Sequence, residues 1–248
     1  MSVKTSIDEL WNSASHAKVI FDPASLADLP EPVSRYLNHA IAPDTPLANA
    51  VRLQMHGEIK VRAWTPFQAE QVIHAERGMI WSAKTRVTGL PVRGADRLVD
   101  GEGSMDWRLF GVFPIMTASG NDVTRSASGR VQAEFVWLPS ALAQPGVEWT
   151  APDEAHIKAT LTVAGNTQSM TLVVADNGRP MYLSLLRWGN PGGGDFSSIA
   201  FGAVFEEERS FGAFTIPTKL RVGWYFGTDR FETEGEFFRC TIDEADYR

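Results

Sequence analysis

The densest group of side chains that could do chemistry lies at residues 96–108, which hold four carboxylates and two arginines. A segment with helical spacing at residues 122–138 adds further charged groups. Carboxylates and guanidinium groups that share a pocket can transfer protons or hold a polar head group. One hypothesis is therefore a hydrolase-type enzyme whose acid, base and anion-holding groups are Asp100, Glu102, Arg125 and Glu134.

Aromatic side chains form the second candidate site. The chain has eight tryptophans and 14 phenylalanines, and core packing explains most of them. A curved sheet with this much apolar surface either fills its concave side with its own helices or leaves a cavity for an apolar ligand. The leading hypothesis is noncatalytic binding of a hydrophobic or lipid-like small molecule, with Arg108 or Arg125 at its polar head and these ligand-binding residues: Trp81, Trp107, Arg108, Arg125, Trp137, Trp188, Phe205 and Trp224.

Other chemistries lack their sequence signals. The five histidines are scattered without metal-ligand spacing, and the glycine-rich residues 189–195 lack the Gly-Lys-Ser/Thr ending of a phosphate cradle. A serine-nucleophile motif of the form G-x-S-x-G is also absent. We therefore expect no metal and no cofactor, and we interpret residues 189–195 as a hairpin loop. A third hypothesis, a protein-interaction module, requires an exposed apolar patch or an unpaired edge strand.

Composition narrows the partners and the compartment. A formal net charge of -7, without a run of basic residues, argues against a nucleic-acid partner. The single cysteine, Cys240, alternates with Phe238 and Ile242 and is interpreted as a packed or surface cysteine without a catalytic role. Residues 1–10 lack the pattern of a secretory signal, and no stretch approaches the roughly 20 apolar residues of a membrane span. The expectation is a cytoplasmic protein, with its oligomeric state left open.

The elements that would position these groups begin with two short helices. Ser6 and Glu9 have the spacing of a capping box, which predicts a first amphipathic helix through Ala14. Pro32 suits a first helical turn, and the apolar spacing continues to Ala40. Residues 1–45 are therefore expected to hold the N-terminal helices.

From residue 51 onward the period changes to two, which is typical of half-buried strands joined by hairpins. Several strands are long, and the twist of a long sheet predicts a half-barrel or open barrel. The fold class is mainly β (α+β), a strongly coiled antiparallel sheet packed on two or three helices. The expected strands are 51–61, 67–75, 79–87, 105–109, 157–163, 170–174, 181–185, 199–211, 216–226 and 231–242.

One helix interrupts the strands at residues 122–138 and should lie against the sheet, with Pro139 closing it. Gly129 inside this helix indicates a close approach to another element. Among the polar residues of the strands, His56 and His74 are expected to face solvent. Glu207 shares a strand face with Phe205, which leaves an inward, paired carboxylate as one interpretation.

Three stretches resemble an uncharacterised bacterial family of unknown function, namely LPEPVSRYL at residues 29–37, DGEGSMDWRLFG at residues 100–111 and TRSASGRVQAEFVWLPSAL at residues 124–142. The resemblance implies one domain and brings no activity, cofactor or site residue with it. The strand layout is also similar to the half-barrels of LolA/LolB-like lipoprotein carriers, which implies an apolar interior. The expected organisation is a single domain, residues 1–248, with helices in 1–45, strands in 51–118, a helix in 122–142 and strands in 147–248.

Overall fold

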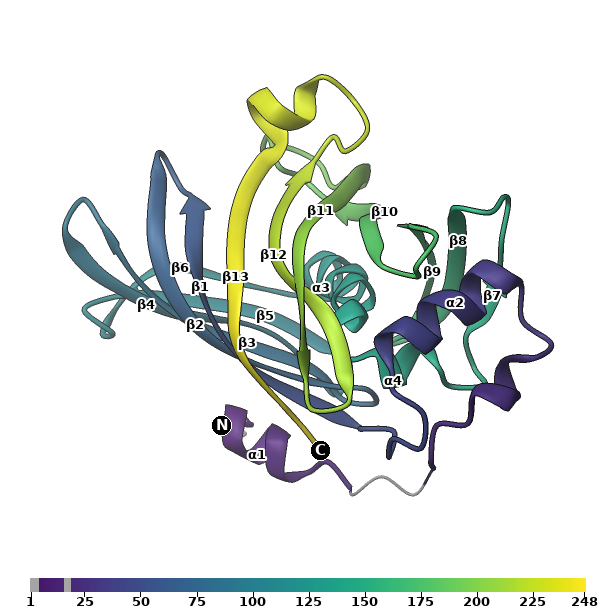
Figure 1. The fold of residues 1–248 in the computed structure, drawn as a ribbon. Coiled ribbons are helices and arrows are strands. Elements are labelled where there is room, and N and C mark those ends of the chain that lie inside the picture. Colours follow the sequence, from purple (N-terminus) through teal and green to yellow (C-terminus); the bar gives the residue numbers. More distant parts are fainter. Residues whose placement is uncertain (1–4, 16–18) are drawn as a thin grey trace.

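Alternation of apolar and polar residues turns most of the chain into antiparallel strands. A computed structural model describes residues 5–15 and 19–248. In this part of the chain, 13 strands form one sheet in the order β6-β5-β4-β3-β2-β1-β13-β12-β11-β10-β9-β8-β7. The sheet curves round helix α3 (Asn121–Glu134), as Figure 1 shows. The mainly β, half-barrel fold that the long alternating segments predict is confirmed.

The N-terminal wing of the sheet is a meander of six strands joined by tight turns. Its strands are β1 (Ala50–Lys60), β2 (Trp64–His74), β3 (Gly78–Val87), β4 (Leu90–Val99), β5 (Glu102–Leu109) and β6 (Phe113–Ser119). The turns β1–β2, β3–β4 and β5–β6 lie at the same end of the wing, because each strand runs antiparallel to the one before it.

The C-terminal wing is a second meander. Its strands are β7 (Glu148–Thr150), β8 (His156–Val163), β9 (Asn166–Val174), β10 (Pro180–Gly189), β11 (Ser197–Phe211), β12 (Phe214–Trp224) and β13 (Glu236–Tyr247). Strand β13 pairs with β1 from Val51↔Tyr247 to Ile59↔Phe238 and so joins the two wings. Strands β6 and β7 end the sheet order and do not pair with each other, so the sheet is an open half-barrel.

The helices lie on both sides of the sheet. Helix α1 (Ile7–Asn12) has the predicted capping box and packs Leu10 against Val72 and Ile80, away from the main core. Helix α3 lies between the wings on the concave side (Figure 1). The helical elements are α1, η1 (Pro23–Leu26), α2 (Glu31–Ala40), α3 (Asn121–Glu134), η2 (Phe135–Trp137), α4 (Pro139–Leu142) and η3 (Phe231–Gly235).

Two glycines allow α3 to lie close to both wings. A Cβ at Gly103 of β5 would lie 2.5 Å from Thr124 Cα, and a Cβ at Gly129 of α3 would lie 3.0 Å from Gln168 Nε2 of β9. The close approach expected at Gly129 is therefore confirmed. Because neither contact leaves room for a larger side chain, helix and sheet are held at a short separation.

Several expectations for the elements are wrong. Strands β4, β6 and β7 were not predicted, because β4 carries charged residues on both faces and β6 and β7 are exposed edges. Pro139 begins α4 instead of only closing the preceding helix. The expected strand at residues 231–242 begins as the π-helical turn η3, so the strand proper starts at Glu236.

Two polar residues also differ from expectation. His74 is buried at 3% exposure instead of facing solvent, because the N-terminal segment packs over the outer face of β2. Glu207 is 64% exposed and bonds to Lys219 at 3.2 Å. The register of β11 shifts on both sides of Glu207, and such a bulge reverses the strand faces that simple alternation assigns.

Candidate functional site

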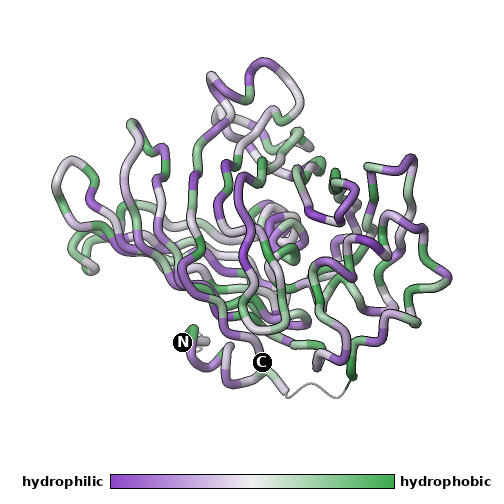
Figure 2. The backbone as a smooth tube through the Cα atoms, viewed as in Figure 1, coloured by the Kyte–Doolittle hydropathy of each residue, from purple (hydrophilic) through white to green (hydrophobic). Residues whose placement is uncertain are grey.

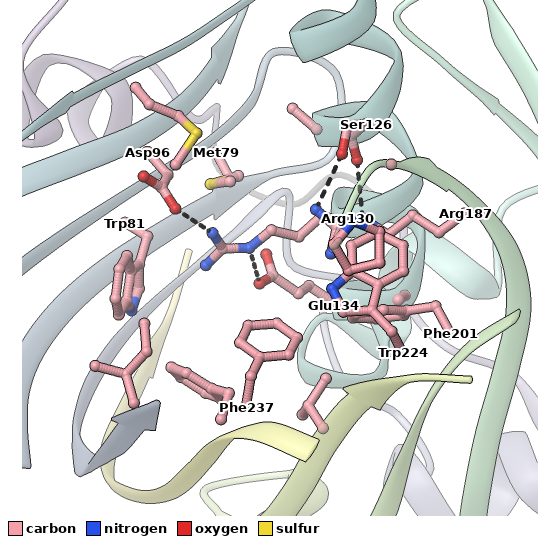
Figure 3. Close-up of a pocket in the computed structure, with 18 of the residues that line it drawn as sticks. Met79, Trp81, Asp96, Ser126, Arg130, Glu134, Arg187, Phe201, Trp224 and Phe237 are labelled. Atoms are coloured by element: carbon pink, nitrogen blue, oxygen red, sulfur yellow. Dashed lines mark hydrogen bonds and ion pairs between the residues drawn. The ribbon is translucent and has the colours of Figure 1, made fainter. Parts of the chain in front are cut away.

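The concave side of the sheet is hollow beside α3. The hollow is a cavity of about 480 Å³ between the inner faces of both wings and the helix, and most of its lining is apolar (Figure 3). Sites for small molecules are usually apolar clefts of about 300–1,000 Å³ with a few polar groups. The cavity therefore has the size and character of a ligand site.

Each wing contributes an aromatic wall. In the N-terminal wing, the ring of Trp81 lies 5.7 Å from that of Trp107, and it also lies 5.9 Å from that of Phe238 on the adjoining strand β13. In the C-terminal wing, Phe201 and Trp224 meet edge to face at 5.0 Å. Such contacts orient the rings and stiffen the cavity walls.

Two of these tryptophans lie over glycines of the same sheet. A Cβ at Gly94 would lie 2.3 Å from Trp107 Cδ2, and a Cβ at Gly189 would lie 2.2 Å from Trp224 Cη2. In each case the indole occupies the space where a side chain would stand. The two glycines therefore set how far the tryptophans lean over the sheet.

Arg130, which lines the cavity, forms ion pairs with two carboxylates. Its Nη1 donates to Asp96 at 2.9 Å and its Nε donates to Glu134, one helical turn away, at 2.7 Å (Figure 3). Gln71 donates to the second oxygen of Glu134 at 2.6 Å, and Trp107 Nε1 donates to Asp96 at 2.9 Å. Burial acts to lower the pKa of Arg130, but the two carboxylates outweigh it and raise that pKa. Arg130 thus has two direct carboxylate partners within the protein.

A second arginine, Arg187, is half-buried and has no direct carboxylate partner. Arg187 Nε donates to the backbone oxygen of Ser126 at 3.1 Å and Nη2 to its Oγ at 3.4 Å, and its Cζ lies 4.6 Å from the ring centre of Phe201. Within the described residues, no carboxylate lies within ion-pair distance of Arg187. Burial, followed by the charge of Arg130, lowers the pKa of Arg187 to about 10, so it stays charged at neutral pH. The charges of Glu134 and Asp96 act in the opposite direction, so these two carboxylates and the two arginines Arg130 and Arg187 balance in number. The cavity wall therefore presents one guanidinium that has no direct ion pair.

The structure brings together five of the ligand-binding residues expected from the sequence. These are Trp81, Trp107, Trp137, Phe205 and Trp224, which all line the cavity. The other three lie elsewhere. Arg108 bonds to Asp106 on the outer surface, and Arg125 lies 3.8 Å over the exposed edge of Trp188, which itself donates to Asp122. The expectation that Arg108 or Arg125 meets a polar head in the cavity is not met by this geometry.

The four groups of the hydrolase hypothesis do not converge. Asp100 is 57% exposed at the β4–β5 turn and pairs with Arg77 at 2.6 Å, and Glu102 is exposed at the start of β5. Of the four, only Glu134 lines the cavity. The structure therefore does not bring Asp100, Glu102, Arg125 and Glu134 together in one pocket, because Asp100 and Glu102 lie at exposed positions beside the β4–β5 turn.

The sequence reasoning missed Arg187 as a site residue. A signal was present, because Arg187 follows Leu183 and Leu185 at a spacing of two, and both leucines are buried on the inner face. An arginine on the same strand face as buried leucines is expected to point inward, where its charge needs a polar partner. Asp96 and Arg130 belonged to the charged segments, but only the fold shows that they meet.

Other reactive groups lie away from this chemistry. Cys240 is buried as expected, and burial raises the pKa of its thiol well above the ordinary value. Among residues 5–15 and 19–248, no cluster of three or more histidine, cysteine or acidic side chains could hold a metal ion. In the same residues, no helix has both the length and the apolar character needed to cross a membrane.

Fold and site together define a class, an open antiparallel half-barrel that encloses an apolar cavity beside one long helix. The chain belongs to the family described as "Family of unknown function (DUF6544)", whose model matches residues 19–234. This match confirms the resemblance that the sequence motifs indicated. None of the curated proteins matches the sequence.

Several solved structures are similar to this chain over most of its length. A LolA superfamily protein from Nitrosomonas europaea is 10% identical with a TM-score of 0.46, over 88% of this chain and 92% of that chain. A putative outer membrane lipoprotein-sorting protein domain from Vibrio parahaemolyticus is 8% identical with a TM-score of 0.42, over 81% and 86%. A DUF1329 family protein from Desulfovibrio piger is 11% identical with a TM-score of 0.43, over 92% and 94%. At these identities the neighbours say nothing of what this chain binds.

Proposed function

We propose that the concave cavity binds a hydrophobic, lipid-like small molecule with an acidic head group, and that it does so without catalysis. The observation that carries this proposal is the apolar cavity of about 480 Å³ with the guanidinium of Arg187, which bonds to Ser126 and to no carboxylate, in its wall. An apolar chain would lie between the two aromatic walls, and a carboxylate or similar monoanion would pair with Arg187.

The apolar part of the ligand follows from the lining. Rings and aliphatic side chains from both wings face a space that water fills poorly, and burial of apolar ligand surface there contributes roughly 25 cal/mol per Å². The aromatic contacts within each wall keep the cavity from collapsing when it is empty. An elongated hydrocarbon chain is the ligand shape that can touch both walls at once.

The acidic head group of the ligand is inferred from the different partners of Arg130 and Arg187. Arg130 already has two carboxylate partners, whereas Arg187 has only the hydroxyl and carbonyl oxygens of Ser126. A guanidinium without a direct carboxylate partner can donate a charge-assisted hydrogen bond to an incoming anion, and such a bond is stronger than one to a neutral acceptor. The wall therefore favours an anion over a neutral head group of the same size.

The test is a titration that follows tryptophan fluorescence, because Trp81, Trp107 and Trp224 line the cavity. The wild-type protein is titrated with a long-chain fatty acid and with the alcohol of equal chain length. Arg187→Met should weaken binding of the acid about tenfold to a hundredfold and leave binding of the alcohol nearly unchanged, since a hydrogen bond to a charged group contributes about 1.5–3 kcal/mol.

The matched control is Arg125→Met. Arg125 also lies over a tryptophan ring, at 3.8 Å, but outside the cavity, so its loss should leave both affinities at the wild-type value. Saturable binding of neither ligand by the wild-type protein would contradict the binding function. Equal affinity of Arg187→Met and wild type for the acid would contradict the role of Arg187.

A further inference from the structure

Exposed apolar side chains gather at one end of the N-terminal wing. The three adjacent turns β1–β2, β3–β4 and β5–β6, with the strand residues beside them, are called the hairpin tips and comprise residues 60–66, 84–93 and 108–119. Of the eleven large hydrophobic residues exposed in the described part of the chain, the hairpin tips hold seven: Val61, Leu90, Phe110, Val112, Phe113, Ile115 and Met116. Figure 2 shows hydrophobic segments at the free ends of these hairpins, on the left of the view.

The charges of the hairpin tips are opposite in sign to those of the whole chain. The chain has 23 basic and 30 acidic residues, yet the tips contain no aspartate or glutamate. Their basic residues are all exposed: Lys60, Arg62, Lys84, Arg86, Arg93 and Arg108. Asp106 pairs with Arg108 at the inner limit of the tips, and the neighbouring loop before β13 carries Glu232 and Glu234. All the charged side chains within the hairpin tips are therefore positive.

We propose that the hairpin tips dock on the surface of a membrane that contains anionic lipids. Apolar side chains flanked by lysine and arginine are suited to the boundary between head groups and acyl chains, where the apolar groups insert and the cations meet lipid phosphates. Since the rest of the chain is acidic, an anionic surface attracts the tips and repels the remainder, which orients the molecule.

The hairpin tips also border the cavity. Val61, Val87, Ile115 and Met116 belong to the tips and line the cavity as well. A docked molecule would therefore hold the mouth of its cavity against the lipid, and a lipid-like ligand could pass between them without crossing water. This transfer step rests on the proposed function, whereas the docking itself does not.

The geometry favours a membrane over a protein partner. The apolar residues stand on three separate turns and do not form a flat face. The edge strand β6 contains Pro114, which has no N–H to donate to an added strand, so pairing with a second chain along β6 is hindered. A fluid lipid surface can accommodate separate tips that a rigid partner would have to match one by one.

The experiment measures co-sedimentation of the full chain with vesicles. Vesicles of phosphatidylcholine mixed with phosphatidylglycerol are compared with vesicles of phosphatidylcholine alone. Binding should be strong only to the anionic vesicles and should fall as salt is added. The double variant V112D/F113D should bind at least about tenfold more weakly, and Arg86→Glu with Arg93→Glu should lose about fivefold or more for each residue changed.

Matched controls separate the tips from general surface effects. Leu186 is 65% exposed, much as Val112 is at 64%, but it lies on β10, so Leu186→Asp should leave vesicle binding unchanged. Lys158→Glu on β8 is the control for charge. All variants alter exposed positions, and their fatty-acid titrations in solution should match the wild type, so a failure of docking is distinguishable from a failure of ligand binding.

The following results would overturn the proposal. The first is a wild-type protein that stays in the supernatant with both kinds of vesicle. The second is equal loss of binding in the tip variants and in their controls. The third is self-association of the wild-type chain, seen by sedimentation without vesicles and abolished by V112D/F113D, because the tips would then cover a second copy instead of a membrane.

Discussion

Two arginines in one cavity have different electrostatic surroundings. Arg130 is bridged by Asp96 and Glu134, and such a closed network can serve as part of a rigid wall. Arg187 is held by Ser126 and by the faces of Phe201 and Trp224, which position the guanidinium without neutralising it. We propose that this difference between the two residues gives the cavity a preference among head groups.

His74 leads to a pH prediction at the same scale. It is 3% exposed, and burial lowers its pKa below the ordinary 6.5. The unfolded chain therefore binds a proton near pH 6.5 that the folded chain binds only at lower pH. This contribution to stability is complete above pH 6.5 and is lost as the pH falls below it.

The measurement is denaturant unfolding of wild type and His74→Gln between neutral pH and the pH of acid unfolding. The wild type should lose stability more steeply with falling pH, by at most about 1.4 kcal/mol per pH unit from this one group. Parallel pH curves for the two proteins would show that His74 titrates alike in the folded and unfolded chains.

At the scale of elements, glycines set how the aromatic walls form. Gly94→Ala on β4 would place a Cβ 2.3 Å from Trp107 Cδ2, so the indole must move. We expect a loss of about 1–3 kcal/mol in the free energy of unfolding, as for other overpacked sites, together with weaker binding of a fatty acid. Gly146→Ala is the control, because nothing lies within 4 Å of its added Cβ. Unchanged binding and stability in Gly94→Ala would show that Trp107 does not depend on this glycine.

The sequence predicts elements well where burial follows a regular period. The capping box at Ser6, helix α2 and the long strands of the C-terminal wing follow directly from spacing. Prediction from the sequence fails where tertiary contacts override the regular spacing of apolar residues. Strand β4 carries charges because Asp96 faces Arg130 across the cavity, and the bulge beside Glu207 exchanges strand faces, which no local pattern reveals.

At the scale of the whole molecule, the sequence predicts a curved sheet but leaves open whether its concave side is empty. The tryptophans and Phe205 that line the cavity could be foreseen as inward residues of strands. The inward position of Arg187 could be foreseen from its spacing with the buried leucines of β10. Its partner and the Arg130 network could not, because they come from segments 34 to 63 residues apart along the chain. The distance between α3 and the two wings, which decides how much space remains, is set by glycines and long-range packing.

Native mass spectrometry tests the central claim most directly. The intact chain, purified without detergent, is measured before and after incubation with a long-chain fatty acid, together with Arg187→Met as the matched variant. The account predicts a complex with one bound acid per wild-type chain, and much less of that complex for the variant at the same acid concentration. The mass of the bare wild-type chain at every acid concentration, or equal occupancy in the variant, would contradict it.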